Sequence, residues 1–274
     1  MTNTAQPDPR PDPQGDPRPT LRRTALVTGA ASGIGAATAR RFLREGWNVV
    51  VNFHEPGQQA AAEAIVAQAL QPGQRAIAVQ ADVTGDADCV RLVEEAVRAF
   101  GRLDALVNAA GISKMVPHAA LHDLSADDWQ RIYAVNTIGP FQMMRAAAPH
   151  LKAAAPASVV NISSRAGIAG SGSSIAYAAS KGALNTLTLA MARVLAPEVR
   201  VNAVCPVLTE QGFVERLAPE SFAQRRAHQI AVTPLKRIGH PDEVAESIYW
   251  LTSSAAMMTG AIVELDFGMH LNAV

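Results

Sequence analysis

Short apolar segments alternate with longer segments of helical periodicity from Arg23 onward. The apolar segments have strand length, and the expected strands cover residues 24–28, 48–53, 75–81, 104–110, 158–163, 200–205 and 261–266. Helical patterns lie between them at residues 33–45, 57–70, 86–100, 175–196 and 241–253, and a long helix is expected to begin at Ser125, with Asp128 in a capping box. Continuously apolar strands that alternate with helices predict a parallel sheet covered on both faces. We therefore expect a single doubly wound, Rossmann-like α/β domain over residues 23–274.

The first 22 residues do not share this pattern. Residues 2–20 repeat proline with aspartate, glutamine and arginine, and they contain no apolar stretch. This composition cannot bury enough surface to fold, so residues 1–22 are expected to be a disordered Pro-rich tail and not a signal peptide. A proline-rich recognition segment is the alternative. No later apolar run reaches the length of a membrane span.

The charges of the chain are balanced, with 24 Lys and Arg against 24 Asp and Glu. This balance gives no electrostatic reason to expect nucleic acid or a membrane surface as partner. Cys89 and Cys205 form neither a CxxC pair nor a cluster with histidines, which favours a cytoplasmic protein without disulfides. His118 and His122 could share a helix face, but no third ligand accompanies them, so no metal is expected.

Three polar residues could together handle a proton. Tyr177 and Lys181 are four residues apart in the expected helix 175–196 and therefore share a face. Ser164 lies thirteen residues before the tyrosine. A phenol can donate a proton to a carbonyl oxygen, an ammonium can lower the phenol pKa from about 10, and a hydroxyl can polarise the carbonyl. The trio predicts a site for carbonyl reduction.

The first strand runs into a glycine-rich turn, TGAASGIG, at residues 28–35. Gly29, Gly33 and Gly35 allow a tight turn and let a pyrophosphate approach the following helix, whose free N–H groups favour anions. By itself such a turn is also compatible with tight packing of a helix on a sheet. The strand–turn–helix setting favours a nucleotide site.

Together these motifs resemble the short-chain dehydrogenase/reductase family over residues 23–268. Asp82, the NAAG sequence at 108–111, Asn136 in VNTIG and residues 237–245 also match the pattern. The resemblance implies an NAD(P)-dependent oxidoreductase that transfers hydride between nicotinamide and a carbonyl or alcohol substrate. Length and loop size point to the 3-oxoacyl thioester reductases. A small alcohol, sugar or steroid dehydrogenase is the alternative, and a non-catalytic dinucleotide-binding protein is a further one.

The resemblance assigns roles to individual residues. Tyr177 is the expected proton donor, Lys181 lowers its pKa and binds the nicotinamide ribose, and Ser164 steadies the carbonyl oxygen. Asn136 precedes Gly139-Pro140 and is expected to continue a proton relay from Lys181. Contacts to the cofactor are expected from the glycine turn, several strand ends and the catalytic helix: Gly29, Ser32, Gly33, Ile34, Gly35, Phe53, His54, Asp82, Val83, Asn108, Ala109, Gly111, Tyr177, Lys181, Pro206, Val207 and Leu208.

The substrate pocket is expected between residues 165–175 and the variable segment 207–235. Pro206-Val207 stands where the family usually has Pro-Gly, and Asp266-Phe267-Gly268 replaces Asp-Gly-Gly. Both departures alter the surroundings of the cofactor and the substrate, and neither touches the proton-handling trio. The family resemblance also implies a homotetramer, with a dimer as the alternative, assembled through the helices near 125–150 and 175–196.

The choice between NAD and NADP depends on the end of the second strand, where an acid selects the free ribose of NAD. Phe53 occupies that position, and Glu55 is expected to turn into the following loop. Without a carboxylate to repel a 2′-phosphate, NADP is favoured over NAD. Ser32, Asn52 and His54 are the expected hydrogen-bond donors to that phosphate.

Overall fold

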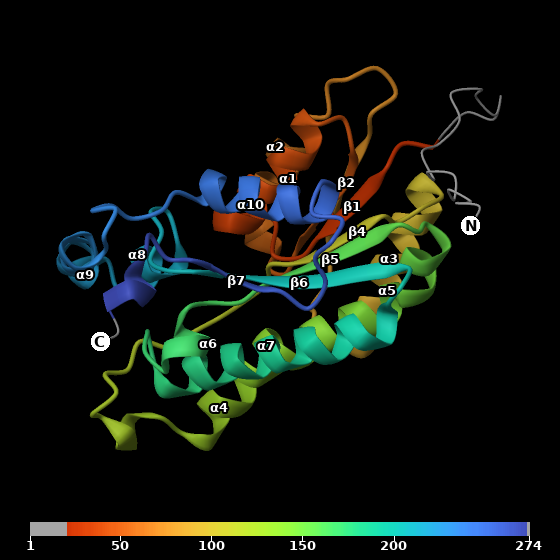
Figure 1. Cartoon of the computed structure of the whole chain (residues 1–274). Helices are drawn as coiled ribbons and strands as arrows, with labels where there is room; N and C mark the ends of the chain where they lie inside the picture. Colours follow the sequence, from red (N-terminus) through yellow and green to blue (C-terminus); the bar gives the residue numbers. More distant parts are fainter. Residues whose placement is uncertain (1–20, 273–274) are drawn as a thin grey trace, which may run out of the picture.

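The structure is a computed structural model that describes residues 21–272 (Figure 1). The tail expected over residues 1–22 lies outside the described residues, apart from Leu21 and Arg22. The Arg22 guanidinium donates hydrogen bonds to the carbonyls of Gly46, at 2.9 Å, and Pro72, at 2.6 Å. Arg22 is therefore attached to the folded domain.

One sheet of seven strands, all paired in parallel, forms the centre of the domain, in the order β3-β2-β1-β4-β5-β6-β7. Leu26 of β1 pairs with Val50 of β2 on one side and with Leu106 of β4 on the other. The strands are β1 (Thr24–Val27), β2 (Asn48–Phe53), β3 (Ala76–Gln80), β4 (Ala105–Asn108), β5 (Ala157–Ile162), β6 (Val199–Pro206) and β7 (Ile262–Leu265).

Helices cover both faces of the sheet, as the alternation predicted (Figure 1). One face packs against α1 (Gly33–Arg44), α2 (Gln59–Val66) and α10 (Pro241–Ser253). The other packs against α3 (Asp86–Phe100), α5 (Gly139–Ala153) and α7 (Ile175–Leu195). Shorter elements join them: η1 (Pro56–Gln58), η2 (Leu121–Asp123), α4 (Ala126–Tyr133), α6 (Ala166–Ala169), α8 (Phe213–Leu217), α9 (Pro219–Val232) and η4 (Met269–Asn272).

Successive strand residues supply the two halves of the hydrophobic core. In β2, Val50 belongs to the cluster beneath α3, α5 and α7, whereas Val49 and Val51 belong to the cluster beneath α1, α2 and α10. All three side chains are fully buried. This arrangement follows from the two-residue period of a strand, which turns neighbouring side chains to opposite faces.

The long helix expected after Ser125 is interrupted. Ser125 and Asp128 form the expected capping box of α4, but a π-helical segment, Ala134–Ile138, separates α4 from α5. Pro140 lies in the first turn of α5 and has no N–H to donate to the preceding turn, which favours a wider turn there. The segment places Asn136 in the interior, with no exposed surface.

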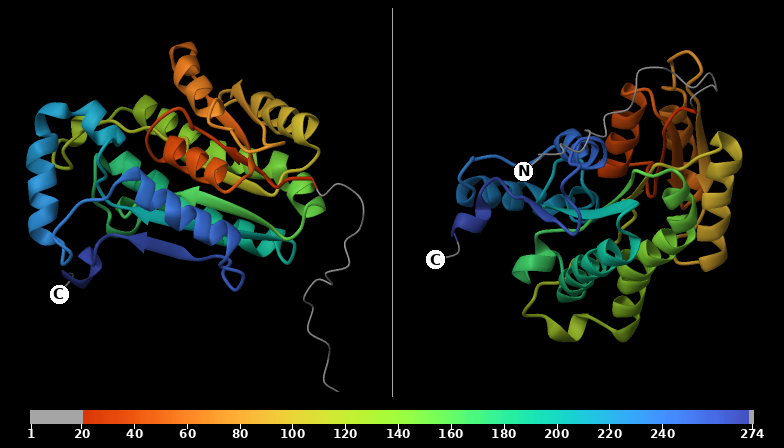
Figure 2. Two further views of the ribbon diagram at one scale, coloured as in Figure 1. Left: turned by 90° about the horizontal axis from the view of Figure 1, so that it is seen from above. Right: turned by 45° about the vertical axis from the view of Figure 1, so that its right-hand side comes forward.

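The segment 207–235, expected to be irregular with some helix, contains α8 and α9. Both helices lie beyond the carboxyl ends of the strands, beside the C-terminal segment (Figures 1 and 2). The chain changes direction between β1 and β4, so a crevice opens at this end of the sheet, where doubly wound folds bind their ligands. None of the helices within residues 21–272 combines the length and apolar character that a membrane crossing requires.

Candidate active site

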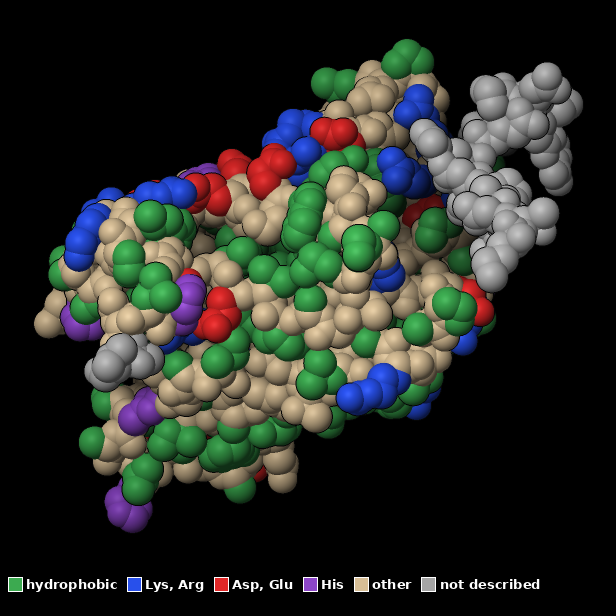
Figure 3. All heavy atoms as spheres, in the orientation of Figure 1, with side chains coloured by type: hydrophobic (Ala, Val, Ile, Leu, Met, Phe, Trp, Pro, Cys, Tyr) green, Lys and Arg blue, Asp and Glu red, His purple; other side chains and the backbone are tan. Residues whose placement is uncertain are grey.

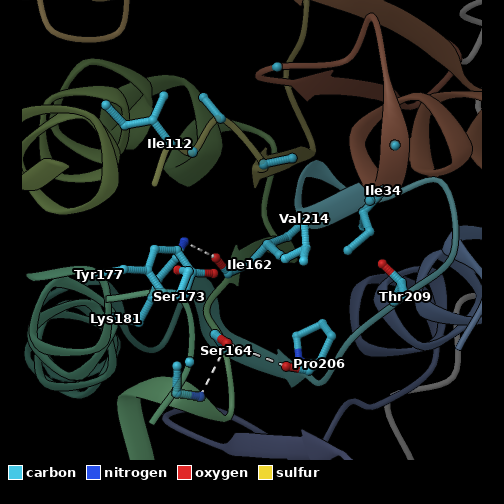
Figure 4. A pocket seen from close by; sticks show the side chains of 18 of the residues that line it. Ile34, Ile112, Ile162, Ser164, Ser173, Tyr177, Lys181, Pro206, Thr209 and Val214 are labelled. Atoms are coloured by element: carbon cyan, nitrogen blue, oxygen red, sulfur yellow. Dashed lines mark hydrogen bonds between the residues drawn. The ribbon is translucent and has the colours of Figure 1, made fainter. Parts of the chain in front are cut away.

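A cavity of about 1080 Å³ lies at the carboxyl ends of the strands (Figure 4). Its walls come from the glycine turn, the ends of β2 to β6, the N-terminal part of α7 and the segment after β6. Most of the residues that the sequence assigned to catalysis or cofactor binding line it: Gly29, Ser32, Gly33, Ile34, Gly35, His54, Asp82, Val83, Ala109, Gly111, Ser164, Tyr177, Lys181, Pro206, Val207 and Leu208.

At two glycines of the glycine turn, a side chain would not fit. A Cβ on Gly29 would lie 2.8 Å from the Cα of Ala110, and one on Gly35 would overlap the carbonyl oxygen of Gly29. Ser32, the N-cap of α1, makes no side-chain hydrogen bond to the first turn, which also carries no acidic residue. The first N–H groups of α1 are therefore available to an anion. This part of the cavity fits the diphosphate of a dinucleotide.

Tyr177, Ser164 and Lys181 lie near one another on the wall of the cavity (Figure 4). Ser174 caps α7 by accepting a hydrogen bond from the Tyr177 amide at 3.3 Å. The Ser164 hydroxyl, just after β5, hydrogen-bonds the Tyr177 phenol. Lys181 Nζ donates to the carbonyl of Ile162 at 2.7 Å and lies 5.8 Å from the centroid of the tyrosine ring.

Burial dominates the ionisation of both groups. It raises the pKa of Tyr177 to about 12, although the hydrogen bond with Ser164 acts in the opposite direction. It lowers the pKa of Lys181 to about 8. The lowered phenol pKa expected from the sequence is therefore wrong for this structure, because burial disfavours the phenolate. At neutral pH the phenol holds its proton beside a charged lysine, which suits a proton donor.

Asn136 lies behind the cavity and not on its wall. Its Oδ1 accepts the Ile112 N–H at 2.9 Å, and its Nδ2 donates to the Ile112 carbonyl and to Ser180 Oγ, both at 3.0 Å. A Cβ on Gly111 would lie 3.4 Å from Asn136 Oδ1 and 3.7 Å from Lys181 Nζ. The missing side chain of Gly111 thus leaves a space that both polar groups border.

Two residues expected to contact the cofactor do not line the cavity. Phe53 packs into the core beneath α1, because the alternation of β2 turns its side chain inward. Asn108 is buried within the sheet, where its Nδ2 donates to Asn161 Oδ1 at 2.8 Å. Glu55, which was expected to turn into the following loop, lines the cavity instead. In the capping box of η1, its backbone N–H donates to Gln58 Oε1 at 3.3 Å.

The end of the cavity near β2 and β3 is mixed in charge. His54 Nδ1 lies 3.9 Å from Asp82 Oδ2, and Asp82 also accepts the Thr84 amide at 2.9 Å. Asn52, expected to donate to a phosphate, directs its Nδ2 to three backbone carbonyls, and its Oδ1 accepts the Gly29 N–H at 3.2 Å. Asn52 therefore holds the turn in place, and His54 is the exposed donor at this end.

Some cavity residues could not be recognised from the sequence. Met115 and Arg131 line the wall from the chain between β4 and the π-helical segment, and Met269 lines it from η4. Ser173 lies in the expected wall 165–175, and its hydroxyl pairs with that of Ser113 at 2.5 Å. Within residues 21–272, no group of three or more His, Cys, Asp or Glu could hold a metal ion.

Comparisons with known proteins agree with this geometry. A family model described as enoyl-(acyl carrier protein) reductase matches residues 29–270. A relative named as ketoacyl reductase 2 of the granaticin polyketide synthase from Streptomyces violaceoruber is 43% identical over 250 residues, which are 90% of this chain and 96% of the relative. The cis-4-hydroxycyclohexanecarboxylate dehydrogenase of Sinomonas cyclohexanicum is 39% identical over 247 residues, 89% of this chain and 95% of that one. A crystal structure from Burkholderia xenovorans, described as a short-chain dehydrogenase/reductase, has a TM-score of 0.84 and 41% identity, and the match covers 91% of this chain and 98% of that one.

Proposed function

Because the chain belongs to the short-chain dehydrogenase/reductase family, we propose that it reduces the ketone of a 3-oxoacyl thioester with NADPH. Enzymes of this family are NAD(P)-dependent oxidoreductases that act on carbonyl or alcohol substrates, and this chain is such an enzyme. The proposal depends on one observation. Tyr177, Ser164 and Lys181 line the same cavity as the glycine turn and the N-terminus of α1, which has no side-chain cap.

The chain's own residues fit a dinucleotide along the whole cavity. The N–H groups at the start of α1 are available to the diphosphate, and Asp82, just after β3, is placed to contact the adenine. Lys181 is placed to hydrogen-bond the nicotinamide ribose beside the space at Gly111. The bound nicotinamide supplies the hydride.

The protein moves the matching proton. Tyr177 donates its phenolic proton to the substrate oxygen as negative charge develops there, and the Ser164 hydroxyl stabilises the same oxygen. The phenolate left on Tyr177 is stabilised by the Lys181 ammonium, 5.8 Å from the ring centroid. Burial keeps the proton on the phenol until the substrate oxygen takes it, because it raises the pKa of Tyr177 to about 12.

Asn136 has a positioning role in this proposal. Its amide fixes the Ile112 backbone and the Ser180 hydroxyl, and Ser180 in turn donates to the Tyr177 carbonyl at 2.7 Å. The wall around Gly111 is thereby tied to the first turns of α7. A water or hydroxyl in the space at Gly111 would connect Asn136 to Lys181 and complete the expected proton relay.

The ketoacyl reductase relative supports the thioester substrate. The hydroxycyclohexanecarboxylate dehydrogenase, nearly as similar, supports a small ring alcohol as the second candidate. Acetoacetyl-coenzyme A with NADPH, and ring hydroxy acids with NADP⁺ or NAD⁺, would be compared at the absorbance of the reduced nicotinamide. We expect much the higher kcat/KM for the thioester. Turnover of the ring alcohols alone would select the second candidate.

NADPH is preferred in this proposal because the exposed side chain at the end of β2 is His54, which carries no negative charge. The nearby Glu55 lies in the loop that enters η1, where its backbone N–H donates to Gln58 Oε1 at 3.3 Å. His54→Asp would place a carboxylate at this point, and we expect it to weaken NADPH binding about tenfold relative to NADH, since like charges brought together oppose binding. An unchanged ratio of the two dissociation constants would contradict the assignment of His54.

We also propose that the enzyme is a homotetramer, with a dimer as the alternative. Support comes from exposed apolar side chains on helices, namely Phe141 on α5, Leu189 and Val194 on α7, and Trp250 on α10. Figure 3 shows hydrophobic side chains gathered over the face that carries α7 and α10. Apolar patches of this kind mark contact surfaces. The cytoplasmic location expected from the sequence stays a prediction.

A further inference from the structure

The segment after β6 brings a cation to the glycine turn. Arg216 of α8 lines the cavity, and its Nη1 lies 4.0 Å from the position that a Cβ would take on Gly33, the first residue of α1. We propose that Arg216 binds the cofactor diphosphate together with the N–H groups at the start of α1. This inference rests on the dinucleotide-dependent reaction proposed above and adds a binding residue that neither the motifs nor the relatives assign.

The local structure holds Arg216 in this place. Gln211, in the turn that precedes α8, has a positive φ of 53°. Its N–H donates to Glu215 Oε2 at 2.7 Å, and its carbonyl accepts from Arg216 Nη1 at 3.3 Å. That carbonyl is itself 3.7 Å from the same Cβ position on Gly33. Two side chains of α8 thus stabilise a strained turn that lies directly against the start of α1.

The charges around Arg216 leave it ready for an anion. Arg226 in the same segment pairs with Glu210, whereas no carboxylate within residues 21–272 lies within 4.0 Å of the guanidinium of Arg216 or of Arg225. The first turn of α1 carries no acidic residue either. A guanidinium and the positive end of a helix therefore face the same volume, and a diphosphate between them would satisfy both.

This placement has a consequence for the reaction. The segment that carries Arg216 also supplies Thr209 and Val214 to the cavity wall. A cofactor held by Arg216 would therefore fix this wall before the substrate enters.

The test measures the dissociation constants of NADPH and NADH by fluorescence titration of the full chain, without a turnover assay. Arg216→Gln removes the charge, and Arg216→Glu reverses it. Arg225→Gln is the matched control, because Arg225 also lines the cavity, is exposed, and hydrogen-bonds only Ser221 Oγ, at 3.2 Å, among the described residues.

We expect Arg216→Gln to weaken the binding of both cofactors by the same factor, about fivefold to tenfold. This factor lies between the effects of losing an exposed ion pair and of losing a charged hydrogen bond. Arg216→Glu should weaken both further, and Arg225→Gln should change neither by more than about twofold. Unchanged binding in Arg216→Gln, an equal loss in Arg225→Gln, or a loss confined to NADPH would each overturn the inference. If the wild-type chain bound neither dinucleotide, the proposed function would fail as well, so the two failures are distinguishable.

Discussion

Replacing Tyr177 with phenylalanine removes one hydroxyl and leaves the ring. Tyr177 is 6% exposed, and its ring lies near Gly172, where a Cβ would be 3.9 Å from Tyr177 Cδ1. Phenylalanine keeps this ring and therefore its packing. The lost hydrogen bond with Ser164 should lower the free energy of unfolding by about 1 kcal/mol. The lost proton donor should lower turnover about 10²- to 10⁴-fold, equivalent to about 3–5 kcal/mol of barrier. The effect on the barrier exceeds the effect on stability, so the two can be separated.

The assay is kcat for reduction of acetoacetyl-coenzyme A at saturating NADPH, with thermal unfolding and the NADPH dissociation constant measured in parallel. Tyr249→Phe is the matched control, because among the described residues its phenol bonds only Glu45 Oε2, at 3.4 Å and away from the cavity. We expect the control to keep its turnover, and Tyr177→Phe to keep its fold and its affinity for NADPH. Near-normal turnover in Tyr177→Phe would refute the assignment of Tyr177 as proton donor.

Three further outcomes are expected. The kcat of ketone reduction should be level below pH 7 and fall as the pH rises through about 8, because the Lys181 ammonium is lost there while Tyr177 keeps its proton. Lys181→Arg should remove that decline. A level pH profile of the wild type well above pH 8 would contradict the role given to the Lys181 ammonium. Gly35→Ala should lower the free energy of unfolding by about 1–3 kcal/mol and weaken NADPH binding, because the new Cβ would overlap the Gly29 carbonyl. Gly57→Ala is the control, because a Cβ on Gly57 would have no atom within 4 Å, and it should be neutral in thermal and urea unfolding. Light scattering at micromolar concentration should give the mass of four chains, and the mass of one chain would rule the assembly out.

The sheet and the catalytic trio were predictable because local patterns specify them. Apolar runs of strand length and helical periods between them are direct consequences of burial on two faces, and the structure confirms the strands and the Ser125 capping box. Tyr177 and Lys181 share a helix face through their spacing alone. Ser164 could be assigned only through the family pattern, yet its position after β5 brings its hydroxyl to the phenol.

The two predicted cofactor contacts that do not line the cavity lie at strand ends, where a shift of one residue decides which way a side chain faces. At the end of β2, the alternation sends Phe53 into the core and leaves Asn52 and His54 on the cavity wall. Asn108 ends β4 with its side chain inside the sheet, next to Asn161, whereas Ala109 reaches the cavity. A shift of one residue reverses the face of every side chain in a strand, and sequence patterns locate strand ends less closely than that.

The properties that control reactivity were out of reach because they depend on tertiary burial. The i,i+4 spacing of Lys181 and Tyr177 suggested a phenol pKa lowered by a nearby charge, but the same helix face is enclosed by β5 and the segment 165–175, and burial moves both pKa values toward the neutral forms. Arg216 illustrates the same limit, since its relation to Gly33 exists only after the segment beyond β6 folds back onto α1. Contacts of this kind join segments that are far apart in the sequence, so no local pattern of residues can predict them.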